Sequence, residues 1–159
     1  MKLWQRCIIF WIFLFFAQGV QAEVKPFVKG SLSSILEESK GIQTAIIFWS
    51  VTCSPCIQEM YLWKELVQKD PELNLVFVST DMISTSDKIS KILNRFELED
   101  HASWAFADSF VEKIRFDVDP QWYGELPLTF LLSTNGNMQK VIGMVEDQDL
   151  KQWGSPLGT

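Results

Sequence analysis

The sequence predicts an α/β fold, in which a central mixed β-sheet is flanked by helices. Strand-like and helix-like segments alternate between residues 43 and 118, which favours parallel strands joined by helices. The first strand-like run is apolar, as in a strand that is buried on both faces. Nearer the C-terminus, Asn135-Gly136 separates two further strand-like runs, which is typical of a β-hairpin. The hairpin adds antiparallel strands to the sheet.

The first half of the predicted domain contains two strands and two helices. Residues 43–49 form the first strand, because this short apolar run is not interrupted by a charge. Apolar residues then recur at roughly helical spacing until Asp70-Pro71 ends the segment. Residues 73–80 form the second strand. Residues 87–96 carry their apolar side chains on one side and form the second helix.

The second half begins with a short strand at residues 104–107 and a short helix at residues 110–116. The hairpin strands span residues 128–132 and 138–145. A last amphipathic segment, residues 147–153, is expected to cover the sheet. We find no internal repeat, low-complexity tract or linker rich in proline, glycine and serine, so the sequence predicts one folded domain.

The first 22 residues have the pattern of a secretory signal, which sets them apart from that domain. Lys2 and Arg6 precede an apolar run, and Val20-Gln21-Ala22 supplies small residues at a cleavage site. Cleavage would leave residues 23–159 as the mature domain. The alternative is a retained anchor, but the apolar run is shorter than the roughly 20 residues that a membrane-spanning helix needs. Export would place the domain where disulfides persist.

Charge excludes one class of partner. The chain has 14 lysines and arginines against 20 aspartates and glutamates, for a net charge of -6, and no basic cluster. A nucleic-acid-binding surface needs a concentration of positive charge. We therefore expect no nucleic-acid partner, and contact with a membrane only through an N-terminal anchor.

Cys53 and Cys56 are the only cysteines after residue 22, and they follow the first strand at a strand-to-helix turn. Open sheets of this kind react at the carboxyl ends of their strands. A structural staple is disfavoured, because a bridge across this spacing closes almost no loop. A structural zinc site needs about four ligands, and the domain adds only His101 to the two cysteines. The pattern favours a working dithiol.

The two cysteines differ in their predicted roles. Cys53 stands at a helix N-terminus, where unpaired N–H groups and a partial positive charge stabilise a thiolate, so it is the expected nucleophile. Cys56 lies one turn into the helix, where it is less exposed but within reach to resolve a mixed disulfide. Pro55 keeps the first helical turn rigid.

Two further residues have alternative interpretations. Glu59 lies three residues after Cys56 on the same helical side, either as a proton-shuttling carboxylate beneath the dithiol or as an ordinary solvated side chain. Pro127 stands where the hairpin begins. A cis bond between Leu126 and Pro127 would free the Leu126 backbone to pair with a substrate peptide as an added strand, whereas a trans turn proline is the ordinary alternative.

Two stretches in the expected order resemble a known family. "FWSVTCSPCIQEM" resembles the active-site stretch of the TlpA/ResA/DsbE-like thiol-disulfide oxidoreductases, usually written F-W-A-x-W-C-x-P-C-x-x-E-x-P. "ELPLTFLLSTNG" resembles their L-P-T-T-F-L-I-D-x-x-G. The resemblance covers nearly all of residues 40–144, and the predicted export signal agrees with the family.

The resemblance implies a thioredoxin-like fold with a strand-helix insertion, which would be the region of residues 87–118. It also implies a role for each candidate residue. Cys53 would be the nucleophile, Cys56 the resolving cysteine, Glu59 the active-site carboxylate and Pro127 the cis proline.

For function, the resemblance implies an exported protein thiol-disulfide oxidoreductase in the periplasm or on the outer face of the membrane. Such proteins typically receive electrons from a membrane thiol carrier and pass them to apocytochrome c or to other oxidised cysteines. We expect no cofactor beyond the redox-active Cys53-Cys56 disulfide, and no metal. The substrate-binding residues would be Trp49, Ser54, Pro55 and Leu126.

Departures from the family pattern leave competing functions open. Thr52 replaces the tryptophan that commonly precedes the first cysteine, which removes an aromatic surface, and Tyr61 replaces a helix-kinking proline. A disulfide-forming oxidant would differ from a reductase in redox poise. A copper-binding chaperone on the same fold would want a wider cysteine spacing and a distant histidine, and His101 is expected to be solvated in an acidic loop.

Overall fold

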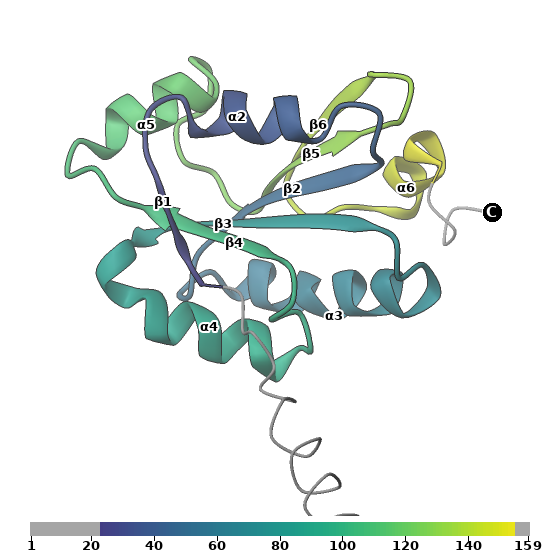
Figure 1. Ribbon diagram of the computed structural model, residues 1–159, viewed down its shortest axis with the longest axis horizontal. Helices are drawn as coiled ribbons and strands as arrows, with labels where there is room; N and C mark the ends of the chain where they lie inside the picture. Colours follow the sequence, from purple (N-terminus) through teal and green to yellow (C-terminus); the bar gives the residue numbers. More distant parts are fainter. Residues whose placement is uncertain (1–22, 155–159) are drawn as a thin grey trace, which may run out of the picture.

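The computed structural model describes residues 23–154. It contains a six-stranded sheet in the order β1-β4-β3-β2-β5-β6, with helices on both faces (Figure 1). The predicted signal, residues 1–22, lies outside the described residues. Across residues 23–154, no helix has the length and apolar character needed to cross a membrane. The elements, in chain order, are β1 (Lys25–Phe27), α2 (Ser31–Glu38), β2 (Thr44–Trp49), α3 (Ser54–Lys69), β3 (Asn74–Met82), the short 3-10 helix η2 (Ile83–Thr85), α4 (Ser86–Arg95), β4 (Ala102–Phe106), α5 (Val111–Val118), β5 (Leu128–Leu132), β6 (Met138–Ile142) and α6 (Asp147–Trp153).

The sheet is mixed, as the sequence predicts. Strand β2 is parallel to β3, β3 to β4, and β4 to β1. The hairpin β5-β6 adds the antiparallel strands, and β5 pairs with β2. The carboxyl ends of the four parallel strands therefore share one edge of the sheet, and the turn that contains the two cysteines lies at that edge.

Strand β2 is apolar because both of its faces are covered. All six of its residues are buried. Ala45, Ile47 and Trp49 pack in one core with α3, α4 and α6, whereas Ile46 and Phe48 pack in a second core with α2 and α5. Figure 1 shows α3 and α4 on one side of the sheet and α2 and α5 on the other.

Strand β6 is shorter than predicted. It ends at Ile142 rather than at residue 145, because Gly143 has a φ of 94° and turns the chain out of the sheet. The backbone N–H of Val145 then donates to the Glu59 side chain instead of a neighbouring strand. By contrast, β5 and α6 have the bounds that the sequence predicts.

Two elements were not expected from the sequence. Strand β1 has only three residues, and its partner β4 lies far along the chain. Helix α2 follows Gly30, whose φ is 88°, and no side chain caps its start. Neither segment carries a strong local pattern. The predicted insertion region, residues 87–118, contributes most of α4, all of α5, and β4, which lies between β3 and β1 in the sheet.

Candidate active site

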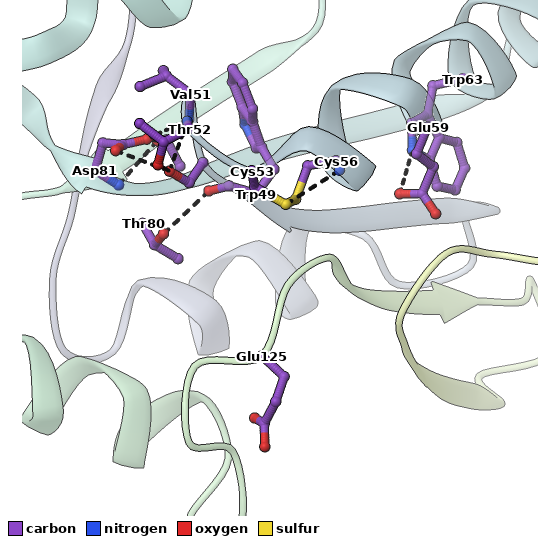
Figure 2. Close-up of a disulfide and its surroundings, with 12 residues drawn as sticks. Trp49, Val51, Thr52, Cys53, Cys56, Glu59, Trp63, Thr80, Asp81 and Glu125 are labelled. Carbon is purple, nitrogen blue, oxygen red and sulfur yellow. Dashed lines mark hydrogen bonds between the residues drawn. A yellow bond between two sulfur atoms is a disulfide. The ribbon is translucent and has the colours of Figure 1, made fainter.

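Cys53 and Cys56 form a disulfide at the start of α3, with their Cα atoms 5.3 Å apart (Figure 2). Cys53 is the N-cap residue of the helix, and its Sγ accepts the backbone N–H of Cys56 at 3.2 Å. Pro55 occupies the first helical turn, where its missing N–H leaves no hydrogen bond unmade. The strand-to-helix placement expected from the sequence is confirmed.

The two sulfur atoms differ in their environment. Cys56 is 1% exposed and packs in the core beneath α3. Cys53 is half-buried, and the next two residues, Ser54 and Pro55, are exposed. A partner can therefore approach Cys53 and the turn that follows it. Cys56 is reached from inside the protein.

The loop between β2 and Cys53 is held by Asp81, a residue that sequence reasoning missed. The carboxylate of Asp81 accepts the backbone N–H of Val51 at 2.8 Å and the hydroxyl of Ser50 at 3.1 Å (Figure 2). A signal was present in the sequence, because the polar run that includes Ser79 and Asp81 ends a strand at the edge where the cysteines lie.

Glu59 is buried, so the solvated interpretation of this residue is wrong. Its side chain is 1% exposed. One carboxylate oxygen accepts the backbone N–H of Val145 at 2.6 Å, and the other accepts the indole N–H of Trp63 at 3.2 Å. Burial raises the pKa of the Glu59 carboxyl above its ordinary value, and these two hydrogen bonds offset part of the rise. Figure 2 shows Glu59 further along α3 than Cys56.

The peptide bond between Leu126 and Pro127 is cis. The pairing of Leu128 with Phe48 places Pro127 beside the end of β2, next to the cysteine loop. Leu126 is half-buried and packs against the same core as Cys53. The structure therefore brings Leu126, Ser54 and Pro55 to the dithiol edge, where the sequence reasoning put the substrate.

The expectation that Trp49 contacts a substrate is corrected by the structure. Trp49 is 0% exposed and packs in the core with Cys56. Its indole N–H has no hydrogen-bond partner within residues 23–154. The reason is the period of the strand: Trp49 points to the face that α3 covers, so it presents no surface to a partner.

A turn that precedes Pro127 is organised by Arg115 of α5. The Arg115 guanidinium donates to the carbonyl of Tyr123 at 2.9 Å. A Cβ atom on Gly124, whose φ is 104°, would lie 2.8 Å from that guanidinium. Trp122 is buried against Phe48, whereas Tyr123 is 80% exposed. Of these two aromatic residues, only Tyr123 offers a surface to a partner.

A metal site needs several ligands close together. Within residues 23–154, no group of three or more histidine, cysteine, aspartate or glutamate side chains is placed to hold an ion. His101 is half-buried and faces the ring of Phe77, with 6.4 Å between the ring centroids. Burial lowers the pKa of His101 below its ordinary value. The expectation of a solvated side chain is corrected.

Comparison with known proteins gives related chains but no matching family model. Thiol-disulfide oxidoreductase ResA of Geobacillus thermodenitrificans is 25% identical over 118 residues, which make up 74% of this chain and 64% of ResA. The chain thus spans less than two thirds of the length of this curated relative.

Solved structures establish the fold. A secreted Mycobacterium tuberculosis disulfide oxidoreductase homologous to E. coli DsbE superimposes with a TM-score of 0.58 at 15% identity, covering 74% of this chain and 83% of that one. The thioredoxin domain of a thiol-disulfide oxidoreductase from Bacteroides vulgatus has a TM-score of 0.54 at 20% identity, covering 72% and 78%. The chain therefore has the thioredoxin-like fold, and its resemblance to the TlpA/ResA/DsbE-like proteins is confirmed.

Proposed function

We propose that this chain is a protein thiol-disulfide oxidoreductase whose reacting groups are Cys53 and Cys56. The observation that carries the proposal is the position of the Cys53 sulfur as the N-cap of α3. In that position the helix N-terminus stabilises a thiolate on an accessible residue, while its disulfide partner is buried beside it. The similarity to ResA supports the same activity.

The reaction follows from the difference between the two sulfurs. In the reduced protein, the Cys53 thiolate attacks one sulfur of a partner disulfide, and the other partner sulfur leaves as a thiolate. Cys56 then loses its proton and attacks the Cys53 sulfur of the mixed disulfide. The Cys53-Cys56 disulfide forms, and the partner leaves with two more electrons as a dithiol.

Glu59 is the proposed acceptor for the proton that Cys56 must lose. A buried carboxylate with a raised pKa exchanges protons nearer to neutral pH than a solvated one does. Glu59 and Cys56 are both buried, and they lie three residues apart in the same helix. In the disulfide neither sulfur carries a proton, so this transfer takes place only after the disulfide has opened.

The substrate is proposed to bind along the edge formed by Leu126 and the exposed residues Ser54 and Pro55. An extended segment of the partner would pair with the Leu126 backbone as an added strand and present its disulfide to Cys53. Backbone pairing supplies affinity that is largely independent of sequence.

We further propose that the protein is exported and acts as a reductase for partner proteins, in pathways such as cytochrome c maturation, with a membrane thiol carrier as its electron donor. The signal pattern of residues 1–22 and the resemblance to ResA support this proposal. One of the structural relatives is described as secreted. The site of action would then be the periplasm or the outer face of the membrane.

A disulfide-forming oxidant is the second candidate, and the capped sulfur favours it. Stabilising the Cys53 thiolate stabilises the reduced form, which makes a cysteine pair more oxidising. The buried Glu59 carboxylate acts in the opposite direction, because negative charge near the dithiol disfavours a thiolate. The balance of these two effects sets the direction of electron flow.

The reduction potential decides between the two candidates. The full chain with Cys7→Ser, which keeps only the Cys53-Cys56 pair, is equilibrated with dithiothreitol or glutathione buffers, and free thiols are trapped and counted. A value near or below about -270 mV supports the reductase, whereas a value near about -120 mV supports the oxidant. The absence of a reversible couple would overturn both.

A further inference from the structure

The strongest unassigned feature of the molecule is the side chain of Asp81, at the end of β3. Its two carboxylate oxygens accept three hydrogen bonds. Oδ2 accepts the backbone N–H of Val51 at 2.8 Å and the hydroxyl of Ser79 at 2.8 Å. Oδ1 accepts the hydroxyl of Ser50 at 3.1 Å (Figure 2). Two of the three donors belong to the loop that precedes Cys53.

The bond to Ser50 extends the influence of Asp81 to the residue next to the nucleophile. A hydroxyl has one proton, and Ser50 uses it toward Asp81. The Ser50 oxygen is then left to accept, and it receives the backbone N–H of Thr52 at 3.2 Å and lies 3.1 Å from the Thr52 hydroxyl oxygen. Asp81 thereby orients all three residues between β2 and Cys53, either directly or through one hydroxyl.

The backbone of the same loop closes on Cys53 itself. The N–H of Cys53 donates to the carbonyl of Ser50 at 3.1 Å, which makes residues 50–53 a hydrogen-bonded turn. The turn ends with the Cys53 sulfur over the first N–H groups of α3. A displacement of Ser50 would therefore displace the sulfur relative to the helix N-terminus.

The geometry of β3 provides an independent observation. The pairing of β3 with β4 is regular up to Ser79, shifts register, and resumes at Met82. Asp81 lies in this irregular stretch, where its side chain is released from the alternation of the strand. Irregularities of this kind re-aim a side chain next to active sites. Here the side chain is aimed at the loop before Cys53.

We propose that Asp81 is a positioning residue for Cys53, which acts through the Ser50–Thr52 loop and does not contact the substrate. The inference rests on the proposed dithiol chemistry and deepens it. Asp81 holds the turn so that the Cys53 sulfur stays at the helix N-terminus after the disulfide has opened, when the covalent link to Cys56 no longer restrains it.

Two substitutions separate hydrogen bonding from charge. Asp81→Ala removes every acceptor, so the loop loosens and the pKa of the Cys53 thiol rises toward the ordinary value of about 8.5. Asp81→Asn keeps one acceptor oxygen for the backbone N–H of Val51. Its amide N–H can donate to the Ser50 oxygen, provided that the Ser50 hydroxyl turns its proton away from residue 81. Asp81→Asn is therefore expected to retain the wild-type pKa or to lower it slightly through loss of the negative charge.

The experiment titrates Cys53 as the one remaining thiol of the full chain, in a Cys7→Ser, Cys56→Ser background, by the ultraviolet absorbance of the thiolate. The reaction rate with a small disulfide is measured in parallel. If the pKa of Cys53 rises by about one unit, the thiolate fraction at a pH below the pKa falls about tenfold. Each thiolate is then about threefold more nucleophilic, so the observed rate should fall about threefold. Thermal unfolding of each variant is recorded alongside.

Asp117→Ala is the matched control. Asp117 also accepts a backbone N–H, that of Gly30 at 2.7 Å, but it holds the loop before α2 rather than the cysteine loop. We expect this control to lower the unfolding temperature without changing the pKa of Cys53. Ser50→Ala removes the hydroxyl that bonds to Asp81 and accepts from Thr52, but it leaves the bond between Asp81 and Val51 in place. It should therefore raise the pKa of Cys53 less than Asp81→Ala does. If Asp81→Ala does not fold, Ser50→Ala provides the test.

The outcomes distinguish this inference from the proposed function. If the wild-type protein reacts with disulfides, and both Asp81→Ala and Ser50→Ala leave the pKa of Cys53 at its wild-type value, the positioning role alone is overturned. The role is also overturned if Asp81→Asn raises the pKa as much as Asp81→Ala. A wild-type protein that does not react with disulfides at all would overturn the dithiol chemistry, and the inference with it.

Discussion

The carboxylate of Glu59 accepts the backbone N–H of Val145 at 2.6 Å, which links the middle of α3 to the segment between β6 and α6. The two residues are 86 positions apart in the sequence. Through this bond, a buried titratable group three residues after Cys56 in α3 is attached to the C-terminal part of the domain. Burying that carboxylate has a cost that depends on pH.

Glu59→Gln is expected to change the pH dependence of stability. The folded-state pKa of Glu59 is raised above its ordinary value of 4.5, so ionised Glu59 destabilises the fold. The penalty is absent below pH 4.5, where the carboxyl is protonated in both the folded and the unfolded chain, and it grows as pH rises to the folded-state pKa. It is fully present above that pKa, at about 1.4 kcal/mol for each tenfold difference in the acid dissociation constant between the two states.

The measurement is the free energy of unfolding of the oxidised wild type and variant by denaturant, across this pH range. Wild type should lose stability relative to Glu59→Gln as pH rises. The amide supplies one acceptor where Val145 and Trp63 offer two donors, so the variant also carries a constant loss that does not depend on pH. A difference between the two proteins that stays constant with pH would contradict the raised pKa.

Single cysteine substitutions should give opposite results with a partner. Cys56→Ser keeps the accessible Cys53 sulfur and removes the resolving thiol, so a mixed disulfide with a model protein disulfide should accumulate. With Cys7→Ser present in both variants, Cys53→Ser keeps only Cys56, which is 1% exposed, and should form little mixed disulfide. Non-reducing electrophoresis and mass spectrometry measure the amount of mixed disulfide that each variant forms. Equal trapping by the two variants would reject the assignment of nucleophile and resolving cysteine.

Gly124→Ala should destabilise the domain and weaken partner binding. At a φ of 104° an alanine is strained, and its Cβ would meet the Arg115 guanidinium at 2.8 Å. We expect a loss of about 1–3 kcal/mol from the backbone conformation, with a further loss as Arg115 is displaced from Tyr123.

Gly136→Ala is the matched control for that variant. Gly136 also has a positive φ, of 88°, but no atom lies within 4 Å of the added Cβ. Chemical denaturation should therefore show a smaller loss for Gly136→Ala. Enzyme kinetics should also separate the two variants. Gly124→Ala alone should raise the KM for a protein disulfide, because its turn precedes Leu126 and Pro127, and it should retain the wild-type rate with dithiothreitol.

Trp49→Ala should affect folding rather than recognition. Trp49 is 0% exposed and packs in the core beside Cys56, so truncation leaves a cavity and is expected to cost about 3–5 kcal/mol. Trp49→Phe fills most of the space and removes an indole N–H that has no partner among the described residues. For Trp49→Phe we expect an unchanged KM with a protein disulfide. A large increase in KM would restore Trp49 as a substrate contact.

Local patterns in the sequence were sufficient for most of the architecture. The apolar run became β2, the hairpin strand and last helix became β5 and α6, and the cysteine pair lies at the predicted strand-to-helix turn. Periodicity and turn chemistry operate within a few residues, so these elements can be inferred from a single chain. The same reasoning predicted that Cys56 is less exposed than Cys53, and the structure agrees.

Tertiary structure alone decided the surroundings of the dithiol. Asp81 meets Val51 across 30 positions, and Glu59 meets Val145 across 86. Strand β1 exists only as a neighbour of β4. Each of these depends on which segments the sheet and its helices bring together. A local pattern shows that a carboxylate lies on a helix or at the end of a strand, but its partners and its burial are set by residues distant in sequence.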